Sequence, residues 1–110
     1  MESNLSIACR LSEPDKAQRL ALLREQLFAA TTHVEETAAG FAFSFANDAA
    51  AIDRVLQFVA SERLCCPFLT FGVTVPPAPE PVVLTMPGDD SIRMFVRDTF
   101  VALTPGMLHT

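Results

Sequence analysis

The sequence predicts a single α+β domain over residues 1–110, folded as a two-layer sandwich. Strand-like segments, in which apolar residues recur at every second position, are interleaved with segments whose apolar residues recur at helical spacing. Half of the residues are apolar, which is ample for one core in a chain of this length. Because each expected helix has one apolar stripe, we expect the helices to cover a single face of an antiparallel sheet.

The first third of the chain predicts a strand followed by a helix. Apolar residues alternate with small or polar ones over residues 5–11, which is typical of a half-buried strand, and Cys9 falls on its apolar side. A helix is expected over about residues 12–30, because Ser12 can cap its first turn and leucines recur within it at steps of three and four.

The middle of the chain predicts a hairpin and a second helix. The hairpin is expected over residues 33–46, and three phenylalanines alternate along its second arm: Phe41, Phe43 and Phe45. Three such residues on one strand face indicate core packing. The second helix is expected over residues 49–66, because Asn47-Asp48 offers a cap and Pro67 ends it.

The last third predicts a second hairpin and a third helix. Its two arms are expected over residues 69–75 and 82–86, joined by a stiff, proline-rich connection. The apolar stripe of the third helix runs from Ile92 to Leu103, and we expect a loose tail over residues 104–110.

This order of elements matches the β-α-β-β-α-β order of a ferredoxin-like sandwich, extended by an extra strand and a C-terminal helix. In that arrangement the strand over residues 5–11 is central. The sheet face turned away from the helices carries Thr, Ser and Glu, but also Ala42 and Val83, and is less polar than a fully wet face. A homodimer formed across this face is therefore expected.

Composition excludes several classes of protein. The net charge of −5 argues against a nucleic-acid binder, because phosphate binding requires a basic surface. No apolar stretch is long enough to span a membrane, and the first residues lack the pattern of a secretory signal. Three cysteines are an odd number and too few for a disulfide framework. We therefore expect a cytoplasmic protein with reduced thiols.

One cluster of chemically reactive residues stands out, in the last turn of the helix expected over residues 49–66. At about 100° per residue, Arg63 and Cys66 fall on the stripe expected to face the core. Glu62 lies beside this stripe, whereas Cys65 points nearly the opposite way. A charge on a buried stripe needs a partner, so Glu62 and Arg63 are expected to give electrostatic support to the site.

The adjacent cysteines have several interpretations. They are small apolar fillers in a structural role, since free Cys is among the most buried residue types. Alternatively, Cys65, Cys66 and Cys9 are thiolate ligands of a soft metal ion such as Zn, Cu or Hg, although the pair lacks the C-x-x-C spacing of zinc sites. A redox switch is a third interpretation, but a disulfide between neighbours is strained. A Cys nucleophile would find its histidine partner in His33.

The run ERLCCPFLTF over residues 62–71 resembles a family of small, uncharacterised bacterial proteins that share an E-R-x-C-C-P-F-x-x-F signature. The alternating Phe hairpin and the final helix are also similar to that family. The resemblance implies an association with heavy-metal-responsive genes, and it assigns no activity. The positions that match the signature are Glu62, Arg63, Cys65, Cys66, Pro67, Phe68 and Phe71.

Taken together, the sequence favours a small cytoplasmic binding or accessory protein with a soft-metal or thiol site at the end of the second helix. Two alternatives stay open: an interaction module that dimerises and binds no small ligand, and a cysteine-dependent enzyme. No nucleophile elbow and no phosphate-binding loop is present, so no catalytic residue is assigned.

Overall fold

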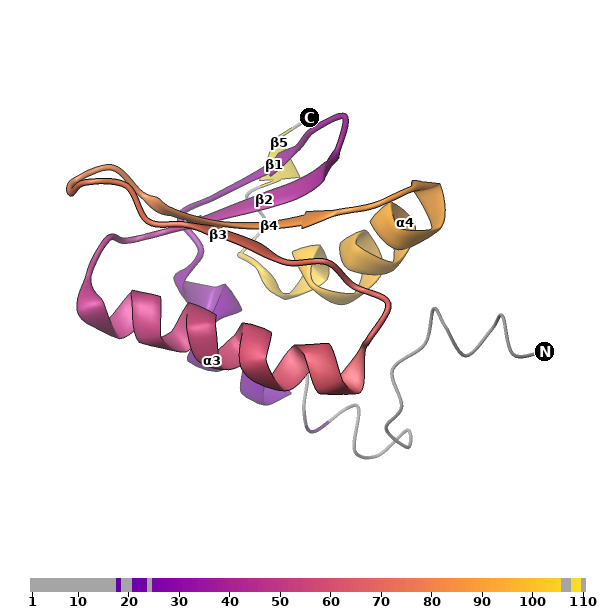
Figure 1. The fold of residues 1–110 in the computed structure, drawn as a ribbon, viewed down its shortest axis with the longest axis horizontal. Coiled ribbons are helices and arrows are strands. Elements are labelled where there is room, and N and C mark those ends of the chain that lie inside the picture. Colours follow the sequence, from indigo (N-terminus) through magenta and orange to yellow (C-terminus); the bar gives the residue numbers. More distant parts are fainter. Residues whose placement is uncertain (1–17, 19–20, 24, 106–107, 110) are drawn as a thin grey trace.

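The computed structural model describes residues 18, 21–23, 25–105 and 108–109. Within these residues the chain forms one sheet whose helices, including the long helix α3 (Ala49–Cys65) and α4 (Asp90–Thr99), lie on the same side of it (Figure 1). The α+β class and the placing of the helices on one sheet face are therefore confirmed. The expected strand over residues 5–11, with Cys9, lies outside the described residues.

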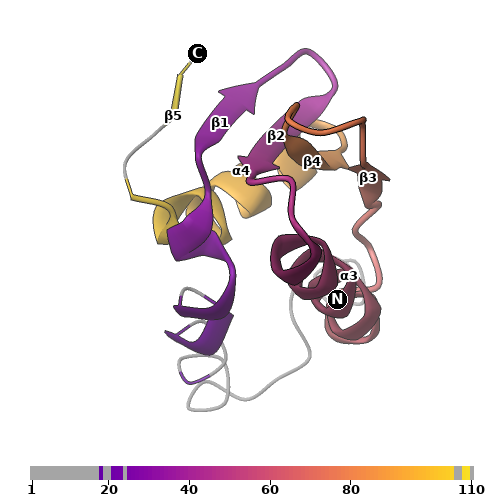
Figure 2. The same cartoon turned by 90° about the vertical axis from the view of Figure 1, so that its left-hand side faces the viewer.

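The sheet contains four antiparallel strands and one short parallel strand. They are β1 (His33–Glu36), β2 (Gly40–Phe45), β3 (Gly72–Thr74), β4 (Val82–Pro87) and β5 (Leu108–His109), in the spatial order β3-β4-β2-β1-β5. Neighbouring strands run antiparallel, except that β5 runs parallel to β1. Figure 2 shows β1 and β2 above the helices, with β5 beside β1.

The register of the sheet turns the large side chains of β2 toward the helices. The predicted core residues Phe41, Phe43 and Phe45 are each at most 1% exposed, which confirms the alternating pattern. Phe43 faces Leu84 of β4 on one side and Val34 of β1 on the other, and both neighbours are fully buried. Three adjacent strands thus present one continuous apolar surface.

A cluster of phenylalanine rings joins this surface to the helices. Phe28 lies at its centre, with its ring centroid 5.4 Å from Phe43 of the sheet, 5.3 Å from Phe58 of α3 and 5.5 Å from Phe100 at the end of α4. Two of these contacts are edge-to-face, a geometry that favours aromatic pairs beyond the area they bury. Phe28 belongs to a short 3-10 helix, η1 (Phe28–Ala30), which follows helical residues at 18, 21–23 and 25–26.

Both helices begin at an aspartate cap, and for α3 this is the start that the sequence predicts. The side chain of Asp48 accepts a hydrogen bond from the backbone N–H of Ala51 at 2.8 Å, and Asp89 accepts one from Ile92 at 3.0 Å. These bonds satisfy backbone donors that have no partner inside the helix. Helix α4 is followed by a second 3-10 helix, η2 (Val101–Leu103), which carries the chain back toward the sheet.

Asn47 holds the proline-rich connection between β3 and β4. Its side-chain amide donates two hydrogen bonds of 2.8 Å, to the backbone carbonyls of Pro76 and Glu80. One residue therefore spans the two ends of this connection and ties them to the start of α3. The sequence predicts a stiff connection here, and these two hydrogen bonds also fix where the connection lies relative to α3.

The ferredoxin-like arrangement is not confirmed. It would place residues 5–11 in the centre of the sheet, beside β2. In the structure, β4 pairs with β2 along the full length of that strand, from Gly40 with Pro87 to Phe45 with Val82. Because β1 occupies the other edge of β2, both edges are filled. The second hairpin folds back next to the first one, and its return strand takes the position expected for the first strand.

The C-terminal end also departs from expectation. The sequence predicts a loose tail after Leu103, yet Leu108–His109 pairs with β1 as strand β5, and Thr104 is buried. The outer edge of β1 offers unpaired backbone groups, and a short strand of almost any composition can satisfy them. No helix among the described residues is long and apolar enough to cross a membrane.

The sheet face away from the helices carries small and polar side chains. In its centre lie Ala42, Ser44, Val83 and Thr85, each of intermediate exposure. None of the described helices covers this face (Figure 1). The homodimer expected across it stays a prediction.

Candidate functional site

The site is built where α3 ends and the chain turns back. The N–H of Cys66 donates to the carbonyl of Glu62 at 2.7 Å, which closes the last helical turn. Cys66 then leaves the helical region with φ −127° and ψ 75°. The N–H of Leu69 donates to the carbonyl of Cys66 at 3.1 Å and so closes a four-residue turn. Pro67 is the second residue of this turn, where its fixed φ is favourable.

Aromatic contacts fix this turn to the core. The ring of Phe68 meets Phe95 of α4 edge-on at 5.0 Å, and the ring of Phe71 meets Phe58 of α3 edge-on at 5.8 Å. Leu69, between them, is buried. The apolar residues after the cysteine pair thus pack the chain that leaves α3 against α4 and back against α3 itself, and they hold Cys66 in place.

The buried face of α3 differs from the predicted one. Val55, Phe58 and Glu62 are its buried residues, whereas Arg63 is exposed. Around the helix axis, the observed buried stripe is rotated from the predicted one by nearly the angle between successive residues, which is about 100°. The physical reason is Phe58, whose large ring packs among the other phenylalanines and sets the rotation of the helix. Arg63 is therefore not buried support for the site.

Three potential ligand atoms converge at the end of α3. A carboxylate oxygen of Glu62 and the sulfur atoms of Cys65 and Cys66 all lie within 4.8 Å of one another. Glu62 is 2% exposed and Cys66 is 1% exposed, which confirms the predicted burial of both. Cys65 packs against the core instead of pointing away from Cys66. The helical rule of 100° per residue fails here because Cys66 has already left the helix.

The two adjacent cysteines differ in redox state. Cys65 is disulfide-bonded, and Cys66 is a buried thiol. The expectation that all three cysteines are reduced is therefore wrong for Cys65. The bond does not join the two neighbours, so the strain expected of a disulfide between adjacent residues does not arise. Cys9, the third cysteine, lies outside the described residues.

The set of side chains at this site has a defined coordination chemistry. Two thiolates and one carboxylate suit zinc, and thiolates also select softer ions such as Cu(I). Zn–S bonds of about 2.3 Å at a tetrahedral angle separate two sulfur ligands by about 3.8 Å. Separations of up to 4.8 Å between the three atoms are close to this requirement. Once Cys65 is reduced, small side-chain rotations would bring Glu62, Cys65 and Cys66 into coordination distance.

His33 does not belong to this cluster. It is exposed on β1 and is absent from the group of converging ligand atoms. Within the described residues, the acid–base group beside the thiols is Glu62. Glu62 is expected beside the stripe, and its spacing of three and four residues from the two cysteines is the signal in the sequence that places it next to them.

A charged contact between β1 and α4 is not indicated by any motif of the sequence. Glu36 accepts hydrogen bonds from Arg93 at 2.7 Å and from Arg97 at 2.6 Å, and Arg93 also donates to the carbonyl of Ala38 at 3.0 Å. The hydrogen bond from Arg93 and the positive charges of both arginines lower the pKa of Glu36. This contact attaches the first hairpin to α4, and it lies on a different element from the cysteine pair.

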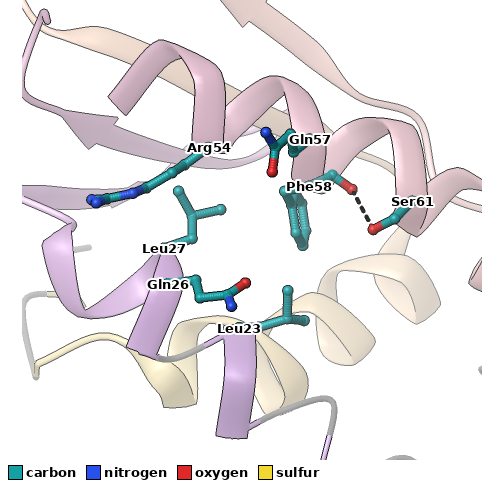
Figure 3. A pocket seen from close by; sticks show the side chains of 7 residues that line it. All are labelled: Leu23, Gln26, Leu27, Arg54, Gln57, Phe58 and Ser61. Atoms are coloured by element: carbon teal, nitrogen blue, oxygen red, sulfur yellow. Dashed lines mark hydrogen bonds between the residues drawn. The ribbon is translucent and has the colours of Figure 1, made fainter. Parts of the chain in front are cut away.

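A separate hollow of about 200 Å³ lies between α3 and the helical residues before η1. Figure 3 shows Arg54 and Gln57 of α3 on one side of it, Gln26 on the other, and Phe58 reaching between them. Ser61 turns back to donate to the carbonyl of Phe58 at 3.5 Å. None of the described residues that line this hollow is a cysteine or carries a carboxylate.

Comparisons with known proteins do not identify a relative: no protein-family model matches the chain, and no curated protein and no solved structure is significantly similar to it.

Proposed function

We propose that the end of α3 is a binding site for a soft metal ion, and that Glu62, Cys65 and Cys66 supply its ligands when Cys65 is reduced. The observation that carries the proposal is the convergence of one carboxylate oxygen and two sulfur atoms within 4.8 Å. Zn(II), Cu(I) and Hg(II) are the ions that such a ligand set suits. The protein then acts as a small metal-binding or accessory protein, and not as an enzyme.

Burial supports this proposal. Glu62 and Cys66 are almost completely removed from solvent. In such surroundings the attraction between a thiolate or carboxylate and a divalent cation is stronger than it is in water. The turn over residues 66–69 is fixed by its own hydrogen bond and by the contact of Phe68 with Phe95, and Phe71 just after it packs on Phe58, so the ligands are held in advance of binding. A preorganised donor set loses little conformational entropy when the ion binds.

The proposal changes the roles expected of two other residues. Arg63 is exposed, so it contributes neither a ligand nor a buried charge. Cys9 was expected as a third thiolate, and it is not needed for the three converging ligands. A fourth position in a tetrahedral zinc site would be filled by water or by a ligand from the metal's donor.

Native mass spectrometry of the reduced protein with Zn(II) or Hg(II) tests the proposal. We expect one ion per chain, with binding weakened at least tenfold by Cys66→Ser and by Glu62→Gln, because each removes one of three ligands. Arg63→Ala is the matched control on the same helical turn, and it should bind like the wild type.

Two outcomes would contradict the proposal. One is the absence of a stoichiometric complex with the fully reduced protein. The other is a complex whose affinity does not change when Cys65 and Cys66 are both replaced by Ser. Either result would leave the cysteine pair as core packing.

A second candidate function is association of two copies through the open sheet face. It is favoured by the small side chains of Ala42, Ser44, Val83 and Thr85, which make a flat surface that no described helix covers. Sedimentation at increasing protein concentration tests it, and Ala42→Lys should abolish a dimer by placing charges at its centre. A monomer at high concentration would contradict it.

A further inference from the structure

The hollow between α3 and the helical residues before η1 has an apolar floor. Leu23, Leu27 and Phe58 line it, and each is at most 8% exposed. Figure 3 shows Leu23 and Phe58 directed toward each other from the two sides. Pockets for drug-sized ligands have volumes of about 300–1,000 Å³, so this hollow of about 200 Å³ suits a smaller molecule. The floor favours an aliphatic or aromatic group over a polar one.

The rim of the hollow carries hydrogen-bond donors and a positive charge. Gln26 stands on one side, Arg54 and Gln57 stand on the other, and all three residues are exposed (Figure 3). Side-chain amides and the guanidinium all donate hydrogen bonds, and the fork of the guanidinium matches a carboxylate in geometry. Among the described residues that line the hollow, only Arg54 is charged, so the rim favours an anion.

Arg54 is available to an incoming anion. Arg93 and Arg97 are both bound to Glu36, whereas none of the described residues forms an ion pair with Arg54. A carboxylate that accepted hydrogen bonds from Arg54 would therefore displace only water. Charge-assisted hydrogen bonds of this kind are about twice as strong as those between neutral groups.

A second hollow limits the charge of the ligand. It has a volume of about 400 Å³, shares Gln26, Arg54 and Gln57 with the first hollow, and is also lined by Asp53. The carboxylate of Asp53 repels a second negative charge beyond Arg54. A ligand with a single carboxylate thus fits the two hollows better than a dicarboxylate does.

We infer that the first hollow binds a small monocarboxylate with an apolar body. The apolar body lies on Leu23, Leu27 and Phe58, and the carboxylate lies at the rim, where Arg54 and the two glutamines donate to it. None of the described lining residues belongs to the proposed metal site, so this inference does not rest on the proposed function.

An NMR titration of the metal-free protein with hexanoate tests the inference. The chain contains no Trp and no Tyr, so their fluorescence cannot report binding. A chelator is present throughout, because a carboxylate is also a ligand for zinc. We expect shifts of the side-chain amides of Gln26 and Gln57 and of the methyl groups of Leu23 and Leu27.

A series of probes separates the role of the floor from that of the rim. Each CH₂ group that leaves water strengthens binding by up to about fourfold, so hexanoate should bind severalfold more tightly than butanoate. Hexylammonium has a similar apolar body and the opposite charge, and it should shift the same signals far less than hexanoate does. Adipate, with two carboxylates, should bind more weakly than hexanoate.

A charge reversal at the rim gives the sharpest result. Arg54→Glu should weaken the binding of hexanoate by about fivefold or more, and it should strengthen the binding of hexylammonium. The residue is exposed, so the variant should fold. Arg63→Glu is the matched control: it makes the same charge change about 14 Å further along α3, beyond the screening length of about 8 Å at physiological ionic strength, and should bind hexanoate like the wild type.

Three results would overturn the inference. They are a titration in which hexanoate shifts none of these signals, equal binding of hexanoate and hexylammonium by the wild type, and an unchanged affinity of Arg54→Glu for hexanoate. Each would leave the proposed metal site untouched, because no metal ion is present in these measurements.

Discussion

Helices α3 and α4 lie on the same sheet face, but the amino-acid pattern of α4 indicates which side is buried much more clearly than the pattern of α3 does. In α4, apart from Met94, the exposed residues are polar, and the stripe from Ile92 to Phe100 faces the core as predicted. In α3, alanines and leucines occupy much of the exposed surface; Leu56 is 50% exposed and Leu64 is 64% exposed.

The difference shows what a hydrophobic pattern can determine. A stripe is located by the polar residues on the opposite side of the helix as much as by its own apolar residues. Helix α4 has that contrast. Helix α3 lacks it, and its rotation is set by the contacts of Phe58 with other rings, which sequence spacing does not encode.

The largest expected effect tests the rotation of α3. Phe58→Ala removes a ring that contacts Phe28, Phe71 and Phe100, and it should lower the free energy of unfolding by about 3–5 kcal/mol. Leu56→Ala, two residues earlier on the exposed side, should change it by less than about 1 kcal/mol. Chemical denaturation measures both. Equal effects would mean that α3 is rotated as the sequence alone predicts.

The helix caps provide a comparison in which α3 and α4 should behave alike. Asp48→Ala and Asp89→Ala each remove a side-chain acceptor from a backbone N–H, and each should destabilise the protein by about 1 kcal/mol. Asp53→Ala, on the exposed body of α3, is the control and should stay within about 0.5 kcal/mol. A cap variant whose free energy of unfolding equals that of the wild type would show that the side-chain cap does not stabilise that helix.

A smaller, pH-dependent effect is expected where α4 meets the first hairpin. The pKa of Glu36 is lowered from its ordinary value of 4.5 in the folded protein, chiefly by the hydrogen bond from Arg93. The stability that this contact supplies is therefore fully present above pH 4.5 and is lost as the pH falls through the lowered pKa.

Thermal unfolding of wild type and Glu36→Gln at a series of pH values checks this sign. The variant should have the lower melting temperature at pH 7, and the two should converge at acidic pH, where both side chains are neutral. The contact is partly exposed to solvent, so the difference should also shrink at high salt. A difference that grows toward low pH would contradict the account.

The smallest expected effect concerns Arg63. The sequence places it on the buried stripe, where its replacement would remove a buried charge and cost several kcal/mol. The structure places it in solvent, so Arg63→Ala should change the free energy of unfolding by no more than about 0.5 kcal/mol. Equilibrium denaturation distinguishes the two cases clearly, and a loss of several kcal/mol would restore the predicted rotation.

Much of the fold is predictable from local patterns. Neighbouring residues are enough to predict three features: the buried phenylalanines of β2, the aspartate caps, and the end of α3 before Pro67. The order of the strands is not. Which strand pairs with β2 depends on how the second hairpin packs, and β4 fills that edge through contacts between residues about forty positions apart. The alternation of apolar residues along β2 would be the same whichever strand paired with it, so the pattern does not indicate the strand order.

The candidate site is predictable in its residue types but not in its geometry. Glu62 and Cys66 are buried, as the pattern indicates. The short distance from the sulfur of Cys65 to Glu62 and Cys66 depends on where the helix ends. Cys66 already lies outside helical geometry, and this changes the direction of its side chain. The oxidised state of Cys65 is likewise not indicated by the spacing of the residues around it.

The most direct test of the central proposal is the X-ray absorption spectrum of the reduced protein loaded with one equivalent of zinc. The account predicts two sulfur neighbours at about 2.3 Å together with oxygen or nitrogen neighbours at about 2.0–2.2 Å, and the loss of one sulfur in Cys66→Ser. A zinc ion surrounded by oxygen and nitrogen alone, unchanged in that variant, would contradict it.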